Sequence, residues 1–265
     1  MKPRFINSSL TSLELGAAAL FLCVPTRADF FDNFDSGTDN GWTHLEPLAA
    51  FGAPGIFSFP DGGYRIQAAA SPDPANLGLG RAGSLRTDMN FAGFFAGFDL
   101  LAWNNSLNQS IGLLGRVSSP GFGTTKGYAF TYSTLGSITI SLVNNEHLTT
   151  LASAPINLDP SRRYNFQFDG IGHALTGGVY DPANHNNLVA LLAVDDDTYA
   201  QGVSGFYLFS NVGSGMADAT FDNYRAVALV PEPSTFSLLA MGASALLWTA
   251  IRRHRETESL RGRDN

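Results

Sequence analysis

The chain has 265 residues; 44% are hydrophobic and only 15% charged, and glycine (28) and phenylalanine (20) are frequent. Typical soluble domains carry about 25% charged residues, and this composition excludes a disordered chain and a coiled coil. The net charge of −7 argues against general nucleic-acid binding, which needs a basic surface, and the single cysteine excludes an internal disulfide and a cysteine-rich zinc framework.

The first 28 residues have the pattern of an export signal. A positive segment at 2–4 precedes an apolar stretch at 15–24, and residues 26–28 offer small side chains at the −3 and −1 positions of a cleavage site. We therefore expect a signal peptide at 1–28 that is cleaved after Ala28. The alternative is a buried N-terminal helix. Cleavage would leave no cysteine in the mature protein, because the single one is Cys23.

Residues 29–229 have the composition of one acidic β-domain. Eight basic residues stand against eighteen acidic ones, which gives this body a net charge of −10. Its acids are nearly all aspartate, and aspartate, glycine and asparagine belong to turns more than to helices. No stretch within the body has the composition of a linker, so we expect a single domain with few helices.

Alternation of apolar and polar residues predicts strands along this body. In residues 164–169 (Tyr-Asn-Phe-Gln-Phe-Asp) the aromatic rings fall on one face and the polar groups on the other. Continuous apolar runs at 91–103, 188–194 and 203–209 are typical of strands buried on both faces, or of the inner sheet of a sandwich. Turn residues recur at spacings of about 8–12 residues, as in β-sandwiches and barrels. Alternation also marks residues 113–117, 128–132 and 137–142.

The two ends of the body resemble the first and last strands of concanavalin A-like, laminin G-type jelly rolls. Asp32-Asn33-Phe34 with Gly41-Trp42 carries the resemblance at the start, and residues 219–224 (Ala-Thr-Phe-Asp-Asn-Tyr) carry it at the end. It implies an all-β fold, a single β-sandwich, in which the two ends lie side by side. It also implies carbohydrate or matrix binding, although fold alone is a poor guide to function.

The body lacks the motifs of familiar hydrolases. A glycoside hydrolase needs two carboxylates that flank the scissile bond. Laminarinase-type relatives of the resembled fold carry them as Glu-x-Asp-x-x-Glu on one strand, and this sequence has no such motif and no Gly-x-Ser-x-Gly. The acids left for catalysis are Asp195, Asp197 and Glu146, and a solvated loop is the simpler interpretation of 195–197. We expect a non-enzyme; the alternative is a glycan-active hydrolase or lyase.

Calcium is the metal that the composition permits, because aspartate, asparagine and backbone carbonyl oxygens suit it. If the two ends of the body pair, Asp32, Asp35 and Asp222 would approach one another and form a calcium site. The alternative is that these residues cap turns through local hydrogen bonds. No other cofactor is expected.

Sugar binding would need an exposed aromatic ring with hydrogen-bonding neighbours. Trp103, Asn104 and Asn105 place a large ring beside two amides at a strand end, and we expect them to contact the ligand. The alternative is that the ring belongs to the core, as most aromatics of an all-β body do. Other candidate rings are Trp42, Tyr128, Tyr132 and Tyr207.

The C-terminus is the most specific feature of the sequence. Residues 230–234 (Val-Pro-Glu-Pro-Ser) precede an apolar run at 236–251 and a basic cluster at 252–255. The prolines hold the motif extended. A helix over the apolar run would be about 24 Å long, which predicts a short transmembrane helix with the following arginines in the cytoplasm.

This ending resembles the PEP-CTERM sorting signal of Gram-negative bacteria over residues 230–255. The resemblance implies recognition by exosortase, a membrane-embedded peptidase, through Pro231, Glu232 and Pro233, with Arg252 and Arg253 after the membrane helix. It implies export by way of the inner membrane to the cell surface or extracellular matrix, often in bacteria that make exopolysaccharide. The alternative is a permanent membrane anchor, and residues 256–265 would form a cytoplasmic tail in either case.

The sequence thus predicts an exported, exosortase-sorted surface or matrix protein. Its non-catalytic β-sandwich is expected to bind polysaccharide or another envelope component, and no nucleic acid.

Overall fold

The computed structural model describes residues 29–182, 184–229 and 248, without the side chains of 184–186. The predicted signal peptide, sorting motif, arginine cluster and tail lie outside the described residues, as does the predicted membrane helix apart from Trp248. Within the described part of the chain, no helix is long and apolar enough to cross a membrane.

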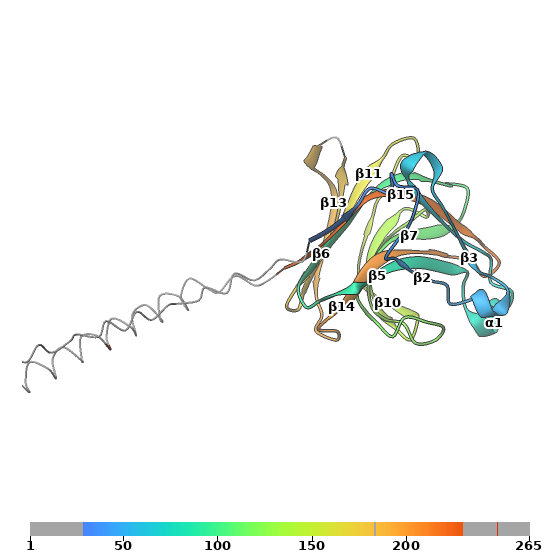
Figure 1. Ribbon diagram of the computed structural model, residues 1–265, viewed down its shortest axis with the longest axis horizontal. Helices are drawn as coiled ribbons and strands as arrows, with labels where there is room; N and C mark the ends of the chain where they lie inside the picture. The colour runs from blue at the N-terminus through green and yellow to red at the C-terminus, as the bar shows by residue number, and fades with distance from the viewer. Residues whose placement is uncertain (1–28, 183, 230–247, 249–265) are drawn as a thin grey trace, which may run out of the picture.

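The body is an antiparallel β-sandwich of two sheets (Figure 1). The eight-stranded sheet runs in the order β13 (Asn184–Asp195), β12 (Ala174–Asp181), β11 (Tyr164–Ile171), β6 (Phe94–Trp103), β15 (Ala217–Ala228), β4 (Tyr64–Ala68), β3 (Gly55–Ser58), and β1 (Asp29–Asp32) also pairs with β15. The seven-stranded sheet runs in the order β10 (His147–Pro155), β9 (Ser137–Asn144), β8 (Lys126–Ser133), β7 (Gln109–Ser118), β14 (Gly202–Ser210), β5 (Arg81–Phe91), β2 (Thr43–Leu45).

Helical structure in the described part of the body, residues 29–182 and 184–229, is limited to single turns. They are α1 (Pro74–Leu77) and the 3-10 turns η1 (Ala49–Phe51) and η2 (Pro60–Gly62). The prediction of an all-β sandwich with few helices is therefore confirmed for the body.

The alternating segments predicted as strands lie in β7, β8, β9 and β11. The run 203–209 lies in β14, a central strand that is buried on both faces. The run 91–103 is interrupted, because Phe91 ends β5 in one sheet and β6 begins at Phe94 in the other. The chain crosses from one sheet to the other at Ala92 and Gly93. The turn was not predicted, because these two residues do not interrupt the apolar run in the sequence.

The interpretation of residues 188–194 as a strand buried on both faces is wrong. They lie in β13 at the edge of the eight-stranded sheet, and Leu188, Val189 and Leu191 are 44–48% exposed. Apolar content predicts a strand, but only the order of strands in the sheet decides how much of it is covered.

The core between the sheets is rich in aromatic rings. Phe98 and Phe166 stack with ring centroids 5.2 Å apart, and Trp42 packs edge-on against Tyr224 at 4.7 Å. Each fully buried ring of this kind contributes about 1.5–3 kcal/mol by leaving water. Phe166 and Phe168 both point inward, as the alternation over 164–169 predicts.

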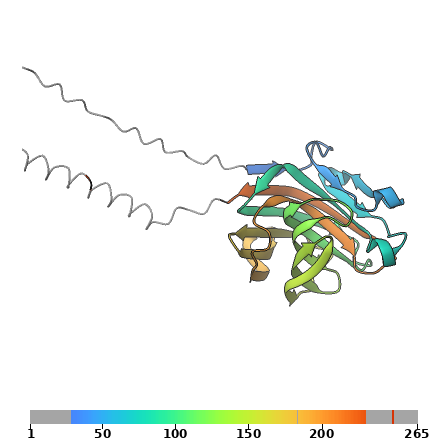
Figure 2. The same cartoon turned by 90° about the horizontal axis from the view of Figure 1, so that it is seen from below.

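The two ends of the body lie side by side at one end of the sandwich (Figure 2). β1 pairs antiparallel with the second half of β15, with Phe31 opposite Arg225 and Asp32 opposite Tyr224. This confirms the expected pairing of the first and last strands.

Candidate functional site

The outer face of the eight-stranded sheet carries a cluster of polar side chains. On β6 the buried Phe94, Ala96, Phe98 and Leu100 point into the core, so the residues between them point outward. Two hollows open on this outer face, one of about 350 Å³ around Gly97 and one of about 510 Å³ around Asp218. We call them the Gly97 hollow and the Asp218 hollow.

The Gly97 hollow exists because a residue without a side chain occupies the middle of the sheet. Gly97 lies opposite Gln167 of β11 and opposite Arg225 of β15. A Cβ atom at this position would lie 3.2 Å from the ring of Phe95, which leans over the glycine. The walls come from four adjacent strands and comprise Phe31, Phe95, Asp99, Asn165, Gln167, Asn223 and Arg225.

Amide groups in this hollow are held by one carboxylate. Asn165 Nδ2 donates to Asp99 Oδ1 at 2.8 Å, and Asn223 Nδ2 donates to Asp99 Oδ2 at 2.9 Å. Gln167 Nε2 then donates to Asn165 Oδ1 at 2.8 Å. Because both oxygens of Asp99 accept hydrogen bonds, the amides are fixed in place before any ligand arrives.

One wall of the Gly97 hollow is an exposed aromatic ring. Phe31 is 58% exposed, although its neighbour Phe30 packs against Trp42 in the interior. An exposed ring beside fixed amides offers an apolar face and directed hydrogen bonds together, which is the arrangement that a sugar ring needs.

A β-bulge in β15 adds Asn223 to the hollow. The register shifts between Asp222 and Arg225, and Asn223 has a φ of 51°, which asparagine tolerates better than most residues. The extra residue lets Asp222 and Asn223 both present their side chains to the outer face.

Asp222 lies directly opposite Asp99 in the pairing of β15 with β6. Burial raises the pKa of the Asp222 carboxyl, and the nearby charges of Asp99 and Asp35 raise it further, against a backbone hydrogen bond from Asn223 that lowers it. The weakest of these influences is Arg163, which lines the Asp218 hollow and lowers the pKa. The carboxyl pair therefore stands between the two hollows.

The three predicted calcium ligands have different surroundings. The charge of Asp35 contributes to the raised pKa of the Asp222 carboxyl. Asp32 instead accepts hydrogen bonds from Trp42 Nε1 and from the Phe34 backbone, both at 2.9 Å. Among the described residues, no group of three or more His, Cys, Asp or Glu side chains is arranged to hold a metal ion. The calcium site stays a prediction.

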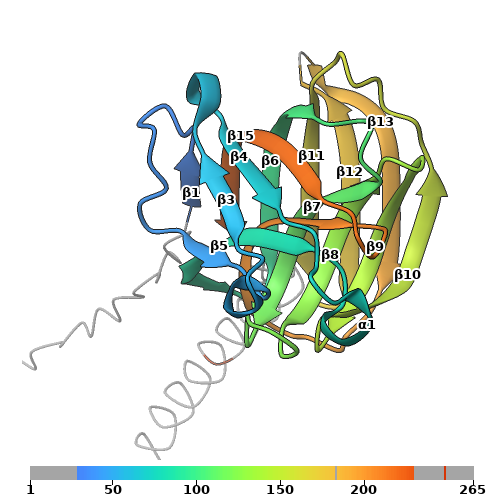
Figure 3. The same cartoon turned by 90° about the vertical axis from the view of Figure 1, so that its right-hand side faces the viewer.

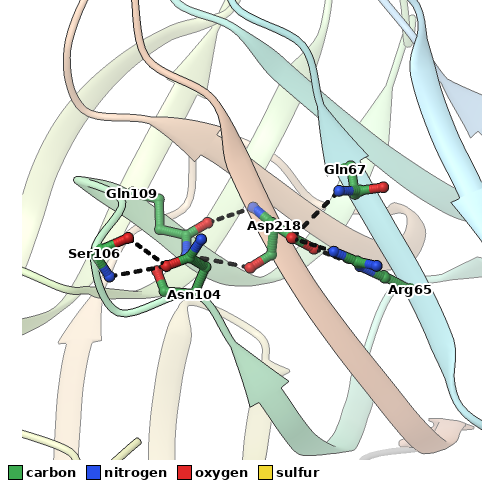
Figure 4. A network of polar contacts seen from close by, with 6 residues as sticks. All are labelled: Arg65, Gln67, Asn104, Ser106, Gln109 and Asp218. Carbon is green, nitrogen blue, oxygen red and sulfur yellow. Dashed lines mark hydrogen bonds and ion pairs between the residues drawn. The ribbon is translucent and has the colours of Figure 1, made fainter. Parts of the chain in front are cut away.

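The Asp218 hollow is organised by a single aspartate (Figure 4). Asp218 accepts hydrogen bonds from Arg65 Nε at 2.8 Å and Nη2 at 2.6 Å, and a longer one from Gln67. Its backbone N–H donates to Gln109 Oε1 at 2.6 Å, and Gln109 also binds the Asn104 carbonyl. The turn after β6 is thereby tied to the start of β15.

The expected platform at 103–105 is corrected by the structure. Trp103 is only 8% exposed, and its ring packs against Tyr132 and Tyr164, so its face is not free to stack on a sugar. Its indole N–H donates to Asn105 Oδ1 at 3.3 Å. Asn104 is exposed and lines the Asp218 hollow. The other candidate rings, Trp42, Tyr128, Tyr132 and Tyr207, are also buried.

The acids considered for catalysis have different surroundings. Glu146 forms a buried ion pair with Arg81, with N–O distances of 2.7 and 2.6 Å. Asp195 is exposed, and His173 Nε2 lies 3.9 Å from its carboxylate. Asp197 lines another hollow, beside Arg116.

Sequence reasoning missed most of the Gly97 hollow. The alternation over 164–169 does place Asn165 and Gln167 on one polar face, and that signal was available. The neighbours Asp99 and Asn223 come from strands far away in the chain, and only the sheet order joins them.

No protein-family model matches the sequence, and no characterised protein matches it significantly. Solved structures do match. The carbohydrate-binding module CBM66 from Bacillus subtilis has a TM-score of 0.53 at 14% identity, over 70% of this chain and 94% of that one. A prokaryotic β-1,3-1,4-glucanase (lichenase) derived from a mouse hindgut metagenome has 0.53 at 11%, over 76% and 99%. Lectin UEA-II complexed with galactose has 0.50 at 9%, over 76% and 99%.

The body therefore has the concanavalin A-like, lectin-type jelly-roll fold. Its structural neighbours include binding modules and lectins as well as glycoside hydrolases. At these identities the likeness shows the fold alone.

Proposed function

We propose that the protein is an exported surface or matrix protein whose β-sandwich binds polysaccharide without cleaving it. The observation that carries the proposal is the Gly97 hollow, where the exposed ring of Phe31 stands beside amides fixed by Asp99. The names of the structural neighbours, which include a carbohydrate-binding module and a lectin, support the same class of ligand.

The net charge of the body indicates which polysaccharides it can bind. The body carries a net charge of −10, and Arg65 and Arg225 are engaged with Asp218 and Asp29. An acidic protein repels an acidic polymer at low salt. We therefore expect neutral polysaccharides to bind better than polymers of uronic acids or sulfated sugars.

Binding is tested on a panel of neutral and anionic polysaccharides with the purified full chain. Truncating Phe31 to alanine removes the exposed ring and is expected to weaken binding about tenfold, or about 1.4 kcal/mol. The matched control is Leu135→Ala, because Leu135 is an even more exposed apolar residue (72%) in the turn between β8 and β9. If both variants lose the same amount of binding affinity, the proposed site is contradicted.

A second candidate function is glycan hydrolysis, and one observation favours it. Asp99 and Asp222 lie opposite each other on neighbouring strands, and a glycosidase needs two carboxylates in one groove. Binding is the better-supported function because both oxygens of Asp99 already accept amide hydrogen bonds. Release of reducing ends from the panel, abolished in Asp222→Asn, would establish the hydrolase instead.

Export and sorting are proposed from residues 1–28 and 230–255, which lie outside the described residues. The expected mature form begins at Asp29 and has lost the segment that follows the Pro-Glu-Pro motif. Mass spectrometry of the protein from cells with active exosortase tests this. If the mature protein still contains residues 252–265, the C-terminal segment is a permanent anchor.

A further inference from the structure

The edge strand β13 combines length with exposed apolar side chains. It lies beyond β12 at the end of the eight-stranded sheet (Figure 3), and no described strand pairs with its other side. Leu188, Val189 and Leu191 are 46%, 44% and 48% exposed. An uncovered edge offers unpaired backbone N–H and C=O groups to another strand.

The other edges of the sandwich are protected in ways that natural proteins use against edge pairing. β1 and β3 have four residues each and β2 has three. β10 has a bulge between Thr150 and Ala152 and ends at Pro155. β13 also has register shifts, at Val189 and between Asn184 and Leu188, but its residues 190–195 pair regularly with β12, and the strand contains no proline. Among the described edge strands, β13 is the longest, with 12 residues, and its regular part ends only at Asp195.

The distribution of charge on the body favours a second copy of the chain as the partner of β13. The body has a net charge of −10, yet residues 184–194 contain no Asp, Glu, Lys or Arg. Two acidic bodies repel over most of their surfaces, and pairing through an uncharged edge avoids placing carboxylates of the two copies against each other. Antiparallel pairing of two identical edges about a two-fold axis is self-complementary and keeps the two Asp195 carboxylates at opposite ends of the contact.

We propose that β13 pairs with β13 of a second copy of this chain, so that the eight-stranded sheet continues across a two-fold axis. Leu191 lies opposite Gly178 and Leu188 opposite Tyr180 in the pairing with β12, which puts both leucines on the outer face. In the dimer, Leu188 and Leu191 of one copy would pack on the outer face against the same leucines of the other copy, and their side chains would be removed from water. The inference does not depend on glycan binding, although the two Gly97 hollows would open on the same side.

Sedimentation velocity of the full chain over a range of concentrations tests the dimer. Leu191→Lys and Val189→Lys place a charge at the contact and are expected to raise the dimer dissociation constant at least about tenfold. Leu135→Lys is the matched control, because Leu135 is exposed on a turn away from β13; it should dimerise like the unmodified chain. Thermal melting of each variant shows that the fold is retained.

Salt provides a second measurement on the unmodified chain. Because the pairing edges are uncharged and the bodies repel, raising the salt concentration should tighten the dimer. A chain that stays monomeric, Leu191→Lys and Val189→Lys variants that dimerise normally, or a dimer that salt loosens would each overturn the proposal.

Discussion

Asp222 on β15 and Asp99 on β6 face each other across the sheet, and the Nδ2 atom of Asn223 lies 3.3 Å from a carboxylate oxygen of the first and 2.9 Å from one of the second. Like charges directly opposite on paired strands destabilise a sheet. The bulge at Asn223 places an amide donor between the two carboxylates, and this amide also forms part of the Gly97 hollow.

Replacing Asn223 by glycine should expose the repulsion between these carboxylates. Glycine accepts the positive φ of 51° at this position, so the bulge can persist while the amide is lost. We expect a loss of about 1 kcal/mol in unfolding free energy at pH 7, measured by urea denaturation. Adding Asp222→Asn should recover most of it. If the double variant is as unstable as the single one, the carboxyl pair is not the cause.

Asp169 on β11 should make the stability of the body depend on pH. Burial raises the pKa of its carboxyl to about 6, from an ordinary value of 3.8. Below about pH 3 the group is protonated in both folded and unfolded chains. As the pH rises from about 4 to about 6, the unfolded chain ionises this carboxyl more readily than the folded protein does, so stability is lost over this range.

The Asp169→Asn variant should therefore match the unmodified chain near pH 3 and be more stable by about 1–2 kcal/mol at pH 7, a figure reduced from the full shift because the carboxyl is partly solvated. Urea denaturation across this pH range measures the difference. A constant difference at every pH would contradict the assignment.

Arg116 should be among the most sensitive positions in the body. Its side chain is 1% exposed and donates to the carbonyl oxygens of Ala92, Tyr199 and Gly172 at 3.1, 3.0 and 2.8 Å. These carbonyls belong to three separate turns at one end of the sandwich. Arg116→Met keeps much of the volume but leaves the carbonyls without their donor, and we expect a loss of about 3 kcal/mol or more.

The control for this position is Arg162→Met. Arg162 is 55% exposed in its side chain and pairs with Asp181 at the surface. Such exposed pairs contribute about 0–1 kcal/mol. Chemical denaturation should thus give a clearly lower unfolding free energy for Arg116→Met than for Arg162→Met. Equal unfolding free energies would show that the Arg116 hydrogen bonds contribute little to stability.

The sequence predicted the strands better than it predicted the site. Alternation over 164–169 depends only on neighbours in the chain, so it correctly assigned Phe166 to the core and Asn165 to the outer face. Trp103 was misjudged because its ring is covered by Tyr132 and Tyr164, which are distant in the chain. The Gly97 hollow needs the order β11-β6-β15, and no local pattern contains that order.

The proposed polysaccharide site is tested most directly by titration calorimetry of the full chain and its Gln167→Ala variant with the best-binding polysaccharide of the panel. Gln167 faces the hollow from β11 and contacts Asn165, so its loss removes a donor without opening the core. The account predicts at least about tenfold weaker binding at an unchanged melting temperature. Unchanged affinity in both Gln167→Ala and Phe31→Ala would contradict it.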